Sequence, residues 1–403
     1  MIYKEALTNN IFNHICNCAD ELGIECYVIG GFVRDYIIDN STAKDIDIVV
    51  VGDGIEFAKH VSKKLKNTPK VTIFKTYGTA MFKYNNMEIE FVGARKESYT
   101  KESRNPKVSV GTLEDDQNRR DFTINSMAFS LNKMNYGALV DPFNGLADIQ
   151  NKVIRTPLSP KITYNDDPLR MLRAIRFATK LDFKINEDSL KSIENLSSRI
   201  KIITNERIIV EINKILLTDK PSLGFILLDK CDLLKHILPE ITSLKGIDEI
   251  EGQTHKDNFY HTLEVLDNIC NHTNDLWLRW AALLHDIGKA PTKRFSKKVG
   301  WTFHGHEFEG SKMVYHLFKR IKLPLNDKMK YVQKLVLMSS RPIVLAQDIV
   351  TDSAVRRLVF DAGDYVDDLM TLCEADITTK NEKKFNKYHN NCLLYTSPSP
   401  RDY

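Results

Sequence analysis

Residues 30–50 read GGFVRDYIIDNSTAKDIDIVV, with two glycines and an arginine ahead of two aspartates that are separated by one residue. Side chains alternate between the faces of a β-strand, so Asp45 and Asp47 would share one face while Ile46 and Ile48 point into a core. Two carboxylates this close repel each other unless a cation lies between them, and oxygen ligands suit Mg²⁺. We interpret this stretch as a strand that carries a magnesium site; the alternative is an exposed edge strand with incidental acids.

The glycines ahead of this strand strengthen the interpretation. A strand that runs into Gly30 and Gly31 and then into a helix leaves backbone N–H groups room to approach a phosphate, and Arg34 adds a positive charge there. A third acid on a neighbouring strand would complete the site. Glu90 in the predicted strand MEIEFVGAR is placed to supply it, and Glu88 alternates onto the same face.

The chain has 403 residues, which predicts several domains because one domain usually holds roughly 100 to 200 residues. Apolar residues make up 42% and charged residues 27%, the mixture of a folded globular protein. Residues 1–24 have the pattern of a helix, and strand and helix patterns are mixed from there up to about residue 150. From about residue 165 apolar residues recur at helical spacing. We therefore expect an α+β fold whose C-terminal portion is all-α, with a linker over 238–257.

The charge and the cysteine content bear on the binding partners and on the cellular compartment of the protein. A net charge of +4 does not by itself indicate nucleic-acid binding. The seven cysteines form no CxxC pair, which argues against a zinc ribbon or a disulfide framework and favours the reducing cytoplasm. The sequence has no apolar run of about 18 residues, so we expect no membrane partner. Residues 392–403, CLLYTSPSPRDY, change character abruptly, and we expect them to be a non-native tail in place of natural sequence beyond about residue 391.

Five motifs in order over residues 25–220 resemble the class II nucleotidyltransferases of the polymerase-β superfamily, which comprise the tRNA nucleotidyltransferases and the bacterial poly(A) polymerases. They are GGFVRD with KDIDIVVVGDG, then EDDQNRRDFTINSMAF (114–129, ribose recognition), DPFNGLADI (141–149, hinge), NDDPLRMLRAIRFA (165–178, base reading) and NERIIVEINKILL (205–217). The resemblance implies a polymerase-β-like catalytic head over 1–150, followed by a helical nucleotide-selecting and RNA-binding neck and body over 151–240.

The same resemblance implies transfer of nucleotides from CTP and ATP to the 3′ end of tRNA. Asp45, Asp47 and Glu90 would hold two Mg²⁺ ions that contact the attacking and leaving oxygens. The family's nucleotide-binding positions correspond to Gly30, Gly31 and Arg34 for the triphosphate, Arg120, Asp121 and Asn125 for the ribose, and Asp167, Arg170 and Arg173 for the base. Arg119 is the near-equivalent neighbour of Arg120.

The base-reading motif also has a physical interpretation. Asp167 before Pro168 is a good N-cap followed by proline at the first helical position, which predicts a helix start there. Arg170 and Arg173 would lie one turn apart beside Asp167, and an acceptor and a donor so placed can hydrogen-bond the Watson–Crick edge of a base. The alternative is a surface salt-bridge ladder. The family commonly has Glu where this chain has Asp166, a difference that could alter the choice between ATP and CTP.

CCA addition is the first interpretation among the activities of this family. The stretch 96–116 retains the full-length loop that CCA-adding enzymes use for the final A, and DIDIVVVGDG resembles the CCA-adding group. Addition of A alone, as by a poly(A) polymerase, is the alternative. A mainly hydrolytic enzyme and a non-catalytic RNA-binding protein are further alternatives, and the intact motifs oppose the last of these.

A second group of residues resembles the HD phosphohydrolase superfamily and implies an HD domain over 250–385. His261, His285, Asp286 and Asp376 occupy its four ligand positions, so we expect a divalent metal there, against the alternative of unrelated polar residues in a helical bundle. We expect Gly288 to end the helix that carries His285 and Asp286. The hypothesis that follows is phosphatase or 2′,3′-cyclic phosphodiesterase activity.

Residues around these four ligands bear on a second metal. His304 and His306 could complete a binuclear site or contact phosphate, and Lys289 could neutralise a phosphate oxygen. Relatives often have a further histidine where this chain has Ser339 and Ser340, which argues against a second metal and against hydrolysis.

Overall fold

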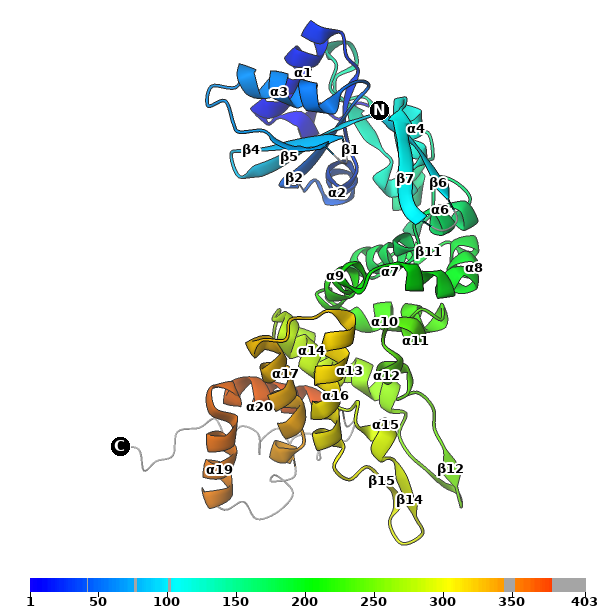
Figure 1. The fold of residues 1–403 in the computed structure, drawn as a ribbon, viewed down its shortest axis with the longest axis vertical. Coiled ribbons are helices and arrows are strands. Elements are labelled where there is room, and N and C mark those ends of the chain that lie inside the picture. The colour runs from blue at the N-terminus through cyan, green and yellow to red at the C-terminus, as the bar shows by residue number, and fades with distance from the viewer. Residues whose placement is uncertain (42, 76–77, 101–102, 344–351, 379–403) are drawn as a thin grey trace, which may run out of the picture. The chain divides into compact units, whose positions relative to one another are not determined.

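The computed structural model describes the whole chain apart from residues 42, 76–77, 101–102, 344–351 and 379–403 (Figure 1). The expected tail, 392–403, therefore lies outside the described residues. The chain divides into two compact units, residues 1–196 and residues from 197 on. The first contains a β-sheet and the second is mainly helical, which confirms the predicted α+β fold. No helix in the described ranges is long and apolar enough to cross a membrane.

The first unit is organised by a seven-stranded sheet of order β3-β4-β5-β2-β1-β8-β9. Strands β2 and β5 run parallel, and the other neighbours pair antiparallel. A parallel pair needs a crossover connection, which here includes the helix α3 (Gly54–Lys64). The strand bounds are β1 Cys26–Ile29, β2 Asp45–Val50, β3 Thr72–Phe74, β4 Thr79–Tyr84, β5 Met87–Gly93, β8 Ala128–Ser130 and β9 Leu139–Val140.

The two faces of this sheet differ in how much apolar material covers them. Ile46, Ile48 and Val50 of β2 belong to a large core with Phe57 of α3 and with Phe12 of α1 (Asn10–Leu22). A smaller apolar cluster covers part of the other face. The predicted alternation is confirmed, because the aspartates of β2 project from the face opposite the large core.

The remaining elements of the first unit differ from the expectations at two places. The helix expected over residues 1–24 is a 3₁₀ turn, η1 (Lys4–Leu7), and α1, because Asn9 caps α1 by accepting a hydrogen bond from the N–H of Ile11. The stretch 96–116 is largely a ribbon of β6 and β7. The bounds are α2 Gly31–Asp39, β6 Arg95–Thr100, β7 Ser103–Val110, α4 Leu113–Asn118, η3 Thr123–Asn125, η4 Lys133–Asn135, α5 Gly145–Gln150, β10 Val153–Ile154, α6 Pro160–Asp166, α7 Leu169–Leu181, β11 Lys184–Ile185 and α8 Glu187–Leu196.

The second unit is a set of packed helices interrupted by two short hairpins. The all-α expectation overlooked both hairpins. The turn between β12 and β13 places Glu251 and Gly252 at φ of 53° and 75°, the two positive values of a type I′ turn, and the pair Glu-Gly is a weak turn signal. The bounds are η5 Ser197–Ile202, α9 Asn205–Leu216, α10 Pro221–Lys230, α11 Leu234–Ile237, α12 Pro239–Thr242, β12 Glu249–Ile250, β13 Gln253–Thr254, α13 Asn258–Cys270, α14 Leu276–Leu284, α15 Lys289–Thr292, β14 Arg294–Ser296, β15 Gly300–Thr302, α16 His306–Ile321, α17 Asp327–Met338, α19 Asp352–Ala362, η6 Gly363–Tyr365 and α20 Val366–Asp376.

Arg279 of α14 ties three segments of the second unit together. Its side chain is 1% exposed and donates five hydrogen bonds. One terminal nitrogen donates to the carbonyls of Leu216 and Thr218, each at 2.7 Å. The other nitrogens donate to the Thr273 carbonyl and the Asn274 side chain. The guanidinium thus satisfies the carbonyls that end α9.

We expect the substitution Arg279→Met to lower the free energy of unfolding of this unit by about 3 kcal/mol or more, because it leaves buried carbonyls without a donor. Denaturant unfolding followed by circular dichroism measures this. Arg294→Met is the matched control, since Arg294 is exposed and donates to the nearby carbonyls of Pro291 and Lys293. Equal losses in the two variants would contradict the structural role of Arg279.

Candidate active site and candidate metal centre

The register of β2 against β5 brings the predicted acids together. Asp47 is the register partner of Glu90, and Asp45 is the partner of Glu88, so all four project from the same face. Glu88 forms an ion pair with Lys83 at 2.6 Å on the neighbouring strand. Glu90 therefore lies opposite Asp47 and stays the predicted third acid, whereas Glu88 is engaged with Lys83.

Gly30 lies directly beside this acid cluster. Its φ is 84°, a value that favours glycine. A Cβ at this position would lie 3.1 Å from a terminal nitrogen of Arg120 and 3.4 Å from Oδ2 of Asp47. The close approach of the backbone to Arg120 and Asp47 therefore requires the glycine. The predicted phosphate-binding turn and the predicted acids meet here.

Burial raises the pKa of Asp47, the Arg120 guanidinium partly opposes this rise, and the carboxylates of Asp116 and Asp45 add to it. A buried carboxylate with a raised pKa is stabilised in its charged form by a bound cation. The donor set is Asp45, Asp47 and Glu90, all oxygen ligands, which is the set that Mg²⁺ prefers. These residues fit the predicted Mg²⁺ site.

Arg34 begins a chain of hydrogen bonds that crosses the site. It forms an ion pair with Asp35 at 2.7 Å and donates to Oδ1 of Asn125 at 2.6 Å. Asn125 in turn donates to Oδ1 of Asp121 at 3.0 Å, and Arg173 donates to Oδ2 of Asp121 at 2.7 Å. The predicted phosphate, ribose and base residues thus form one connected network.

Burial would raise the pKa of Asp121, but the charge of Arg173 and the hydrogen bond from Asn125 lower it to about 2. A folded-state pKa below the unfolded value stabilises the fold above the unfolded pKa, and this contribution disappears as the pH falls through the folded pKa. We expect unfolding titrations to show about 2 kcal/mol of stability lost between about pH 4 and pH 2, and Asp121→Asn to lack this loss. Asp182→Asn, at an exposed position of the same unit, should titrate like the wild type.

Asp116 is a site residue to which the sequence interpretation gave no role. It is fully buried and accepts hydrogen bonds from Nε of Arg119 at 2.9 Å and from Nε of Arg120 at 3.2 Å. Arg119 and Arg120 follow it by three and four residues, the spacing of side chains that meet on a helix. That spacing in DQNRR was the available signal. Asp116 holds both arginines beside the acid cluster.

The start of α7 lies one residue after the expected one, because α7 begins at Leu169 and Pro168 takes the cap position. Asp167 is extended, its Oδ1 accepts from the N–H of Leu169 at 3.2 Å, and its carbonyl accepts from the N–H of Arg170 at 3.0 Å. Arg170 donates to the carbonyl of Arg119, and Arg173 bonds Asp121. These partners lie 51 and 52 residues earlier in the chain. The arginines of α7 therefore face the ribose motif, unlike the expectation for a ladder confined to the helix surface.

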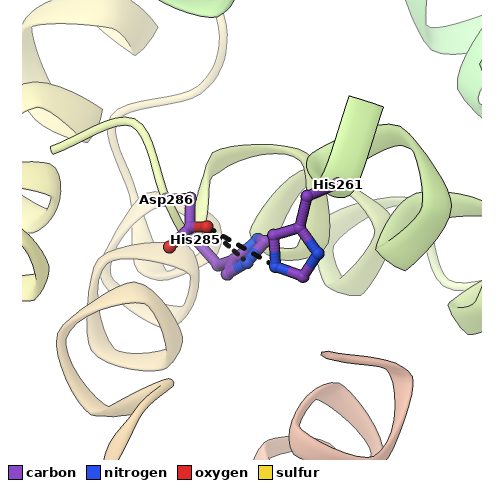
Figure 2. Close-up of side chains that lie close together, drawn as sticks. All are labelled: His261, His285 and Asp286. Atoms are coloured by element: carbon purple, nitrogen blue, oxygen red, sulfur yellow. Dashed lines mark ion pairs between the residues drawn. The ribbon is translucent and has the colours of Figure 1, made fainter. Parts of the chain in front are cut away.

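The second predicted site lies in the second unit, where three helices bring four residues together. His261 comes from α13, His285 and Asp286 from the end of α14, and Asp376 from the end of α20. Nε2 of His261 lies 2.9 Å from Oδ1 of Asp376, and Nε2 of His285 lies 3.3 Å from Oδ2 of Asp286 and 3.6 Å from Oδ1 of Asp376. Figure 2 shows His261, His285 and Asp286 pointing toward one another.

His285 is oriented as a metal ligand. Its Nδ1 lies 2.8 Å from the carbonyl of Ala282, which accepts a hydrogen bond from an imidazole protonated there. Its Nε2 is buried and faces the two carboxylates of the centre, at 3.3 Å from Oδ2 of Asp286 and 3.6 Å from Oδ1 of Asp376. Two imidazoles and two carboxylates suit a divalent transition metal. The four residues fit the predicted metal.

Burial lowers the pKa of His285, but the carboxylates of Asp286 and Asp376 raise it to about 10. Burial raises the pKa of Asp376, but the hydrogen bonds from His261 and His285 outweigh burial and hold this pKa below its usual range. The two carboxylates therefore favour the protonated form of His285, so a metal competes with this proton for the imidazole. Metal binding must release that proton.

The neighbouring residues divide into those that reach the centre and those that do not. Nε2 of His306 lies 3.6 Å from Oδ1 of Asp286, and Lys289 forms an ion pair with Oδ2 of Asp286 at 2.6 Å. Lys289 thus contacts a ligand, whereas the sequence interpretation directed it to a phosphate. His304 is exposed. Ser340 donates a short hydrogen bond to Glu307.

Glycine is required at position 288 for a different reason from the one expected. We expected a helix terminator, yet its φ is −71° and its backbone is right-handed helical. A Cβ here would lie only 1.9 Å from the carbonyl oxygen of His306 and 2.7 Å from the backbone nitrogen of Gly310. Gly288 therefore permits close packing of the His285–Asp286 turn against the start of α16.

Comparison with known proteins follows the same order along the chain. Residues 26–155 match the family described as "Poly A polymerase head domain", residues 182–245 the "Probable RNA and SrmB- binding site of polymerase A", and residues 258–379 the "HD domain". These matches cover the acid cluster, part of the helical region and all four predicted metal ligands.

Two relatives and one solved structure illustrate the similarity. The A-adding tRNA nucleotidyltransferase of Aquifex aeolicus is 31% identical over 82% of this chain, which spans only 42% of that protein's length. The Multifunctional CCA protein of Pseudomonas fluorescens is 33% identical over 75% of this chain and 71% of its own length. A tRNA nucleotidyltransferase solved with a primer tRNA and an incoming ATP analog is 24% identical, with a TM-score of 0.67, over 95% of this chain and 97% of the other. The chain therefore belongs to the family of tRNA nucleotidyltransferases and poly(A) polymerases, and it carries an HD domain.

Proposed function

We propose that this chain adds C, C and A in that order to the 3′ end of tRNA, using CTP and ATP and no nucleic-acid template. The observation that carries the proposal is the meeting of three features at one place: the acids of β2 and β5, the glycine turn at Gly30, and the network that ends at Arg173. The likeness to a structure described with a primer tRNA and an ATP analog supports the choice of substrates.

The residues of this chain divide the work by position. Asp45, Asp47 and Glu90 would hold two Mg²⁺ ions, which when bound neutralise the triphosphate and favour the attacking oxyanion. The remaining predicted residues act through their side chains and backbone. The turn at Gly30 and Gly31 and the side chain of Arg34 bind phosphates. Three residues orient the ribose: Arg120, Asp121 and Asn125. Asp167, Arg170 and Arg173 select the base by hydrogen bonds.

Arg173 raises a question for base selection, because it is paired with Asp121 in the structure. A guanidinium has five N–H donors in a fixed fork, so Arg173 can keep the bond to Asp121 and still donate to a base. In our proposal Asp121 sets the direction in which the Arg173 guanidinium faces the base. The network thereby places protein side chains where a template strand would otherwise present a complementary base.

Addition of A alone is the second candidate, and the similarity to the A-adding Aquifex enzyme favours it. Three RNA substrates separate the two: tRNA lacking CCA, tRNA ending in C, and tRNA ending in CC, each with labelled CTP, ATP or both. Ordered extension of the first substrate to CCA supports our proposal. Extension of only the third substrate indicates an A-adding enzyme, and long A tails on all three indicate a poly(A) polymerase.

For the HD domain we propose a divalent transition metal and a metal-dependent phosphatase or cyclic phosphodiesterase activity at RNA ends. The orientation of His285 supports the metal. Hydrolysis of a 2′,3′-cyclic phosphate in the presence of Mn²⁺ or Ni²⁺ tests the activity. We place the protein in the cytoplasm, in keeping with the six free cysteines of the described residues.

A further inference from the structure

Phe177 of α7 lies among three arginines of the candidate active site. Its ring is 5% exposed, and the guanidinium carbons of Arg34, Arg173 and Arg176 lie 4.9, 5.5 and 4.0 Å from its centroid. Phe122 packs edge-on against the same ring at 5.8 Å. Guanidinium groups within about 6 Å of an aromatic centroid are attracted by its electron-rich face. One buried ring therefore gathers three like charges.

Two of these arginines belong to opposite ends of the proposed nucleotide site. Arg34 follows the glycine turn that we assign to the triphosphate, and Arg173 belongs to the motif that we assign to the base. Hydrogen bonds already join them through Asn125 and Asp121. Both guanidiniums also contact the Phe177 side chain, so Arg34 and Arg173 are connected by two routes: the hydrogen bonds and the aromatic contacts.

We propose that Phe177 is a positioning residue that couples phosphate binding at Arg34 to base selection at Arg173. The inference rests on the proposed function, and it adds a residue that touches no substrate. The hydrogen bonds hold one edge of each guanidinium, and the ring restrains the plane of each. When the triphosphate of a nucleotide binds Arg34, the shared contact with Phe177 would fix the orientation of the Arg173 guanidinium toward the base.

The charges around the ring explain why an aromatic side chain is needed. Asp35 and Asp121 each balance one arginine, at 2.7 and 2.6 Å. Three guanidiniums nevertheless meet at one ring, and an aliphatic side chain would fill the space without attracting them. A purely structural role would require only volume and apolar character at position 177. The two roles therefore differ in what methionine and tyrosine do.

The experiment compares Phe177→Met, which keeps apolar volume and removes the aromatic face, with Phe177→Tyr, which keeps the face. The dissociation constants of CTP and UTP are measured with Mg²⁺ by calorimetry on the full chain, and incorporation of each nucleotide is measured in single turnover. We expect the Met variant to lose about tenfold of the CTP-over-UTP preference and the Tyr variant to keep it. Phe57→Met, at a buried ring of α3 in the core of the same unit, is the matched control.

Each outcome decides the inference. An unchanged preference in Phe177→Met, or an equal loss in the Met and Tyr variants, overturns the coupling role. If the Met variant does not fold, as judged by its melting temperature, Phe177→Leu replaces it because leucine also lacks an aromatic face. If the wild type binds CTP but extends no tRNA, the proposed function fails. The CTP-over-UTP preference in binding then still tests the coupling role of Phe177.

Discussion

Replacing Asp47 with asparagine is expected to lower the rate of nucleotide incorporation at a tRNA 3′ end by on the order of 10³-fold. Asp47 lies opposite Glu90 and beside the turn at Gly30, and asparagine keeps its size while removing the charge that would hold Mg²⁺. Single-turnover extension with labelled CTP measures the effect. Because burial raises the pKa of Asp47, its charge disfavours folding without Mg²⁺, so the variant should melt no lower than the wild type in EDTA.

Two neighbours on β5 supply the internal comparison for this prediction. Glu90→Gln should also reduce incorporation strongly, by about tenfold or more, if Glu90 completes the acid cluster. Glu88→Gln should stay within about twofold of the wild type, because Glu88 is paired with Lys83 and such exposed pairs contribute little. Wild-type activity in Asp47→Asn would refute the site, and equal losses in the two glutamine variants would refute the choice of Glu90.

Asp286→Asn is expected to weaken binding of Mn²⁺ to the HD domain by about 100-fold or more. Asp286 faces both histidines of the centre, and its loss removes the carboxylate that balances a protonated or metal-bound His285. Calorimetric titration of the full chain measures the affinity. The titration uses a background in which Asp45 and Asp47 are both asparagine, so that the first site does not contribute.

The control for the metal centre is Asp367→Asn, an exposed acid on the same helix as Asp376. It should bind Mn²⁺ like the background chain. In an otherwise wild-type chain, Asp286→Asn should leave CCA addition unchanged, because the two sites lie in separate units. Unaltered Mn²⁺ affinity in Asp286→Asn would refute the metal centre, and loss of incorporation would refute the independence of the two sites.

Much of the candidate active site follows from local pattern. The alternation in DIDIVV predicted that Asp45 and Asp47 share a face, and the structure agrees. The pair Asp167-Pro168 predicted the start of α7 to within one residue. The role of Asp116 was also readable from its spacing to Arg119 and Arg120, although that signal was overlooked. These features depend on neighbours within a few residues, where the repeats of strand and helix determine direction.

Other features depend on how distant segments meet. Alternation put Glu88 and Glu90 on one face, and only the parallel register of β2 against β5, with Lys83 on the next strand, separated them. The pairing of Arg173 with Asp121 joins segments 52 residues apart. Gly288 illustrates the same limit, because a side chain at this position would clash with the carbonyl of His306, which lies on another element.

The sequence by itself determined which elements form, which faces of those elements carry chemistry, and which family this chain resembles. Tertiary structure alone decided which acid faces Asp47, which arginines converge on Phe177, and which residues pack against the HD turn. The physical reason is the distance along the chain over which each effect acts. Backbone geometry sets side-chain direction within a few residues, whereas strand register and helix packing result from the burial of whole apolar faces over the entire unit.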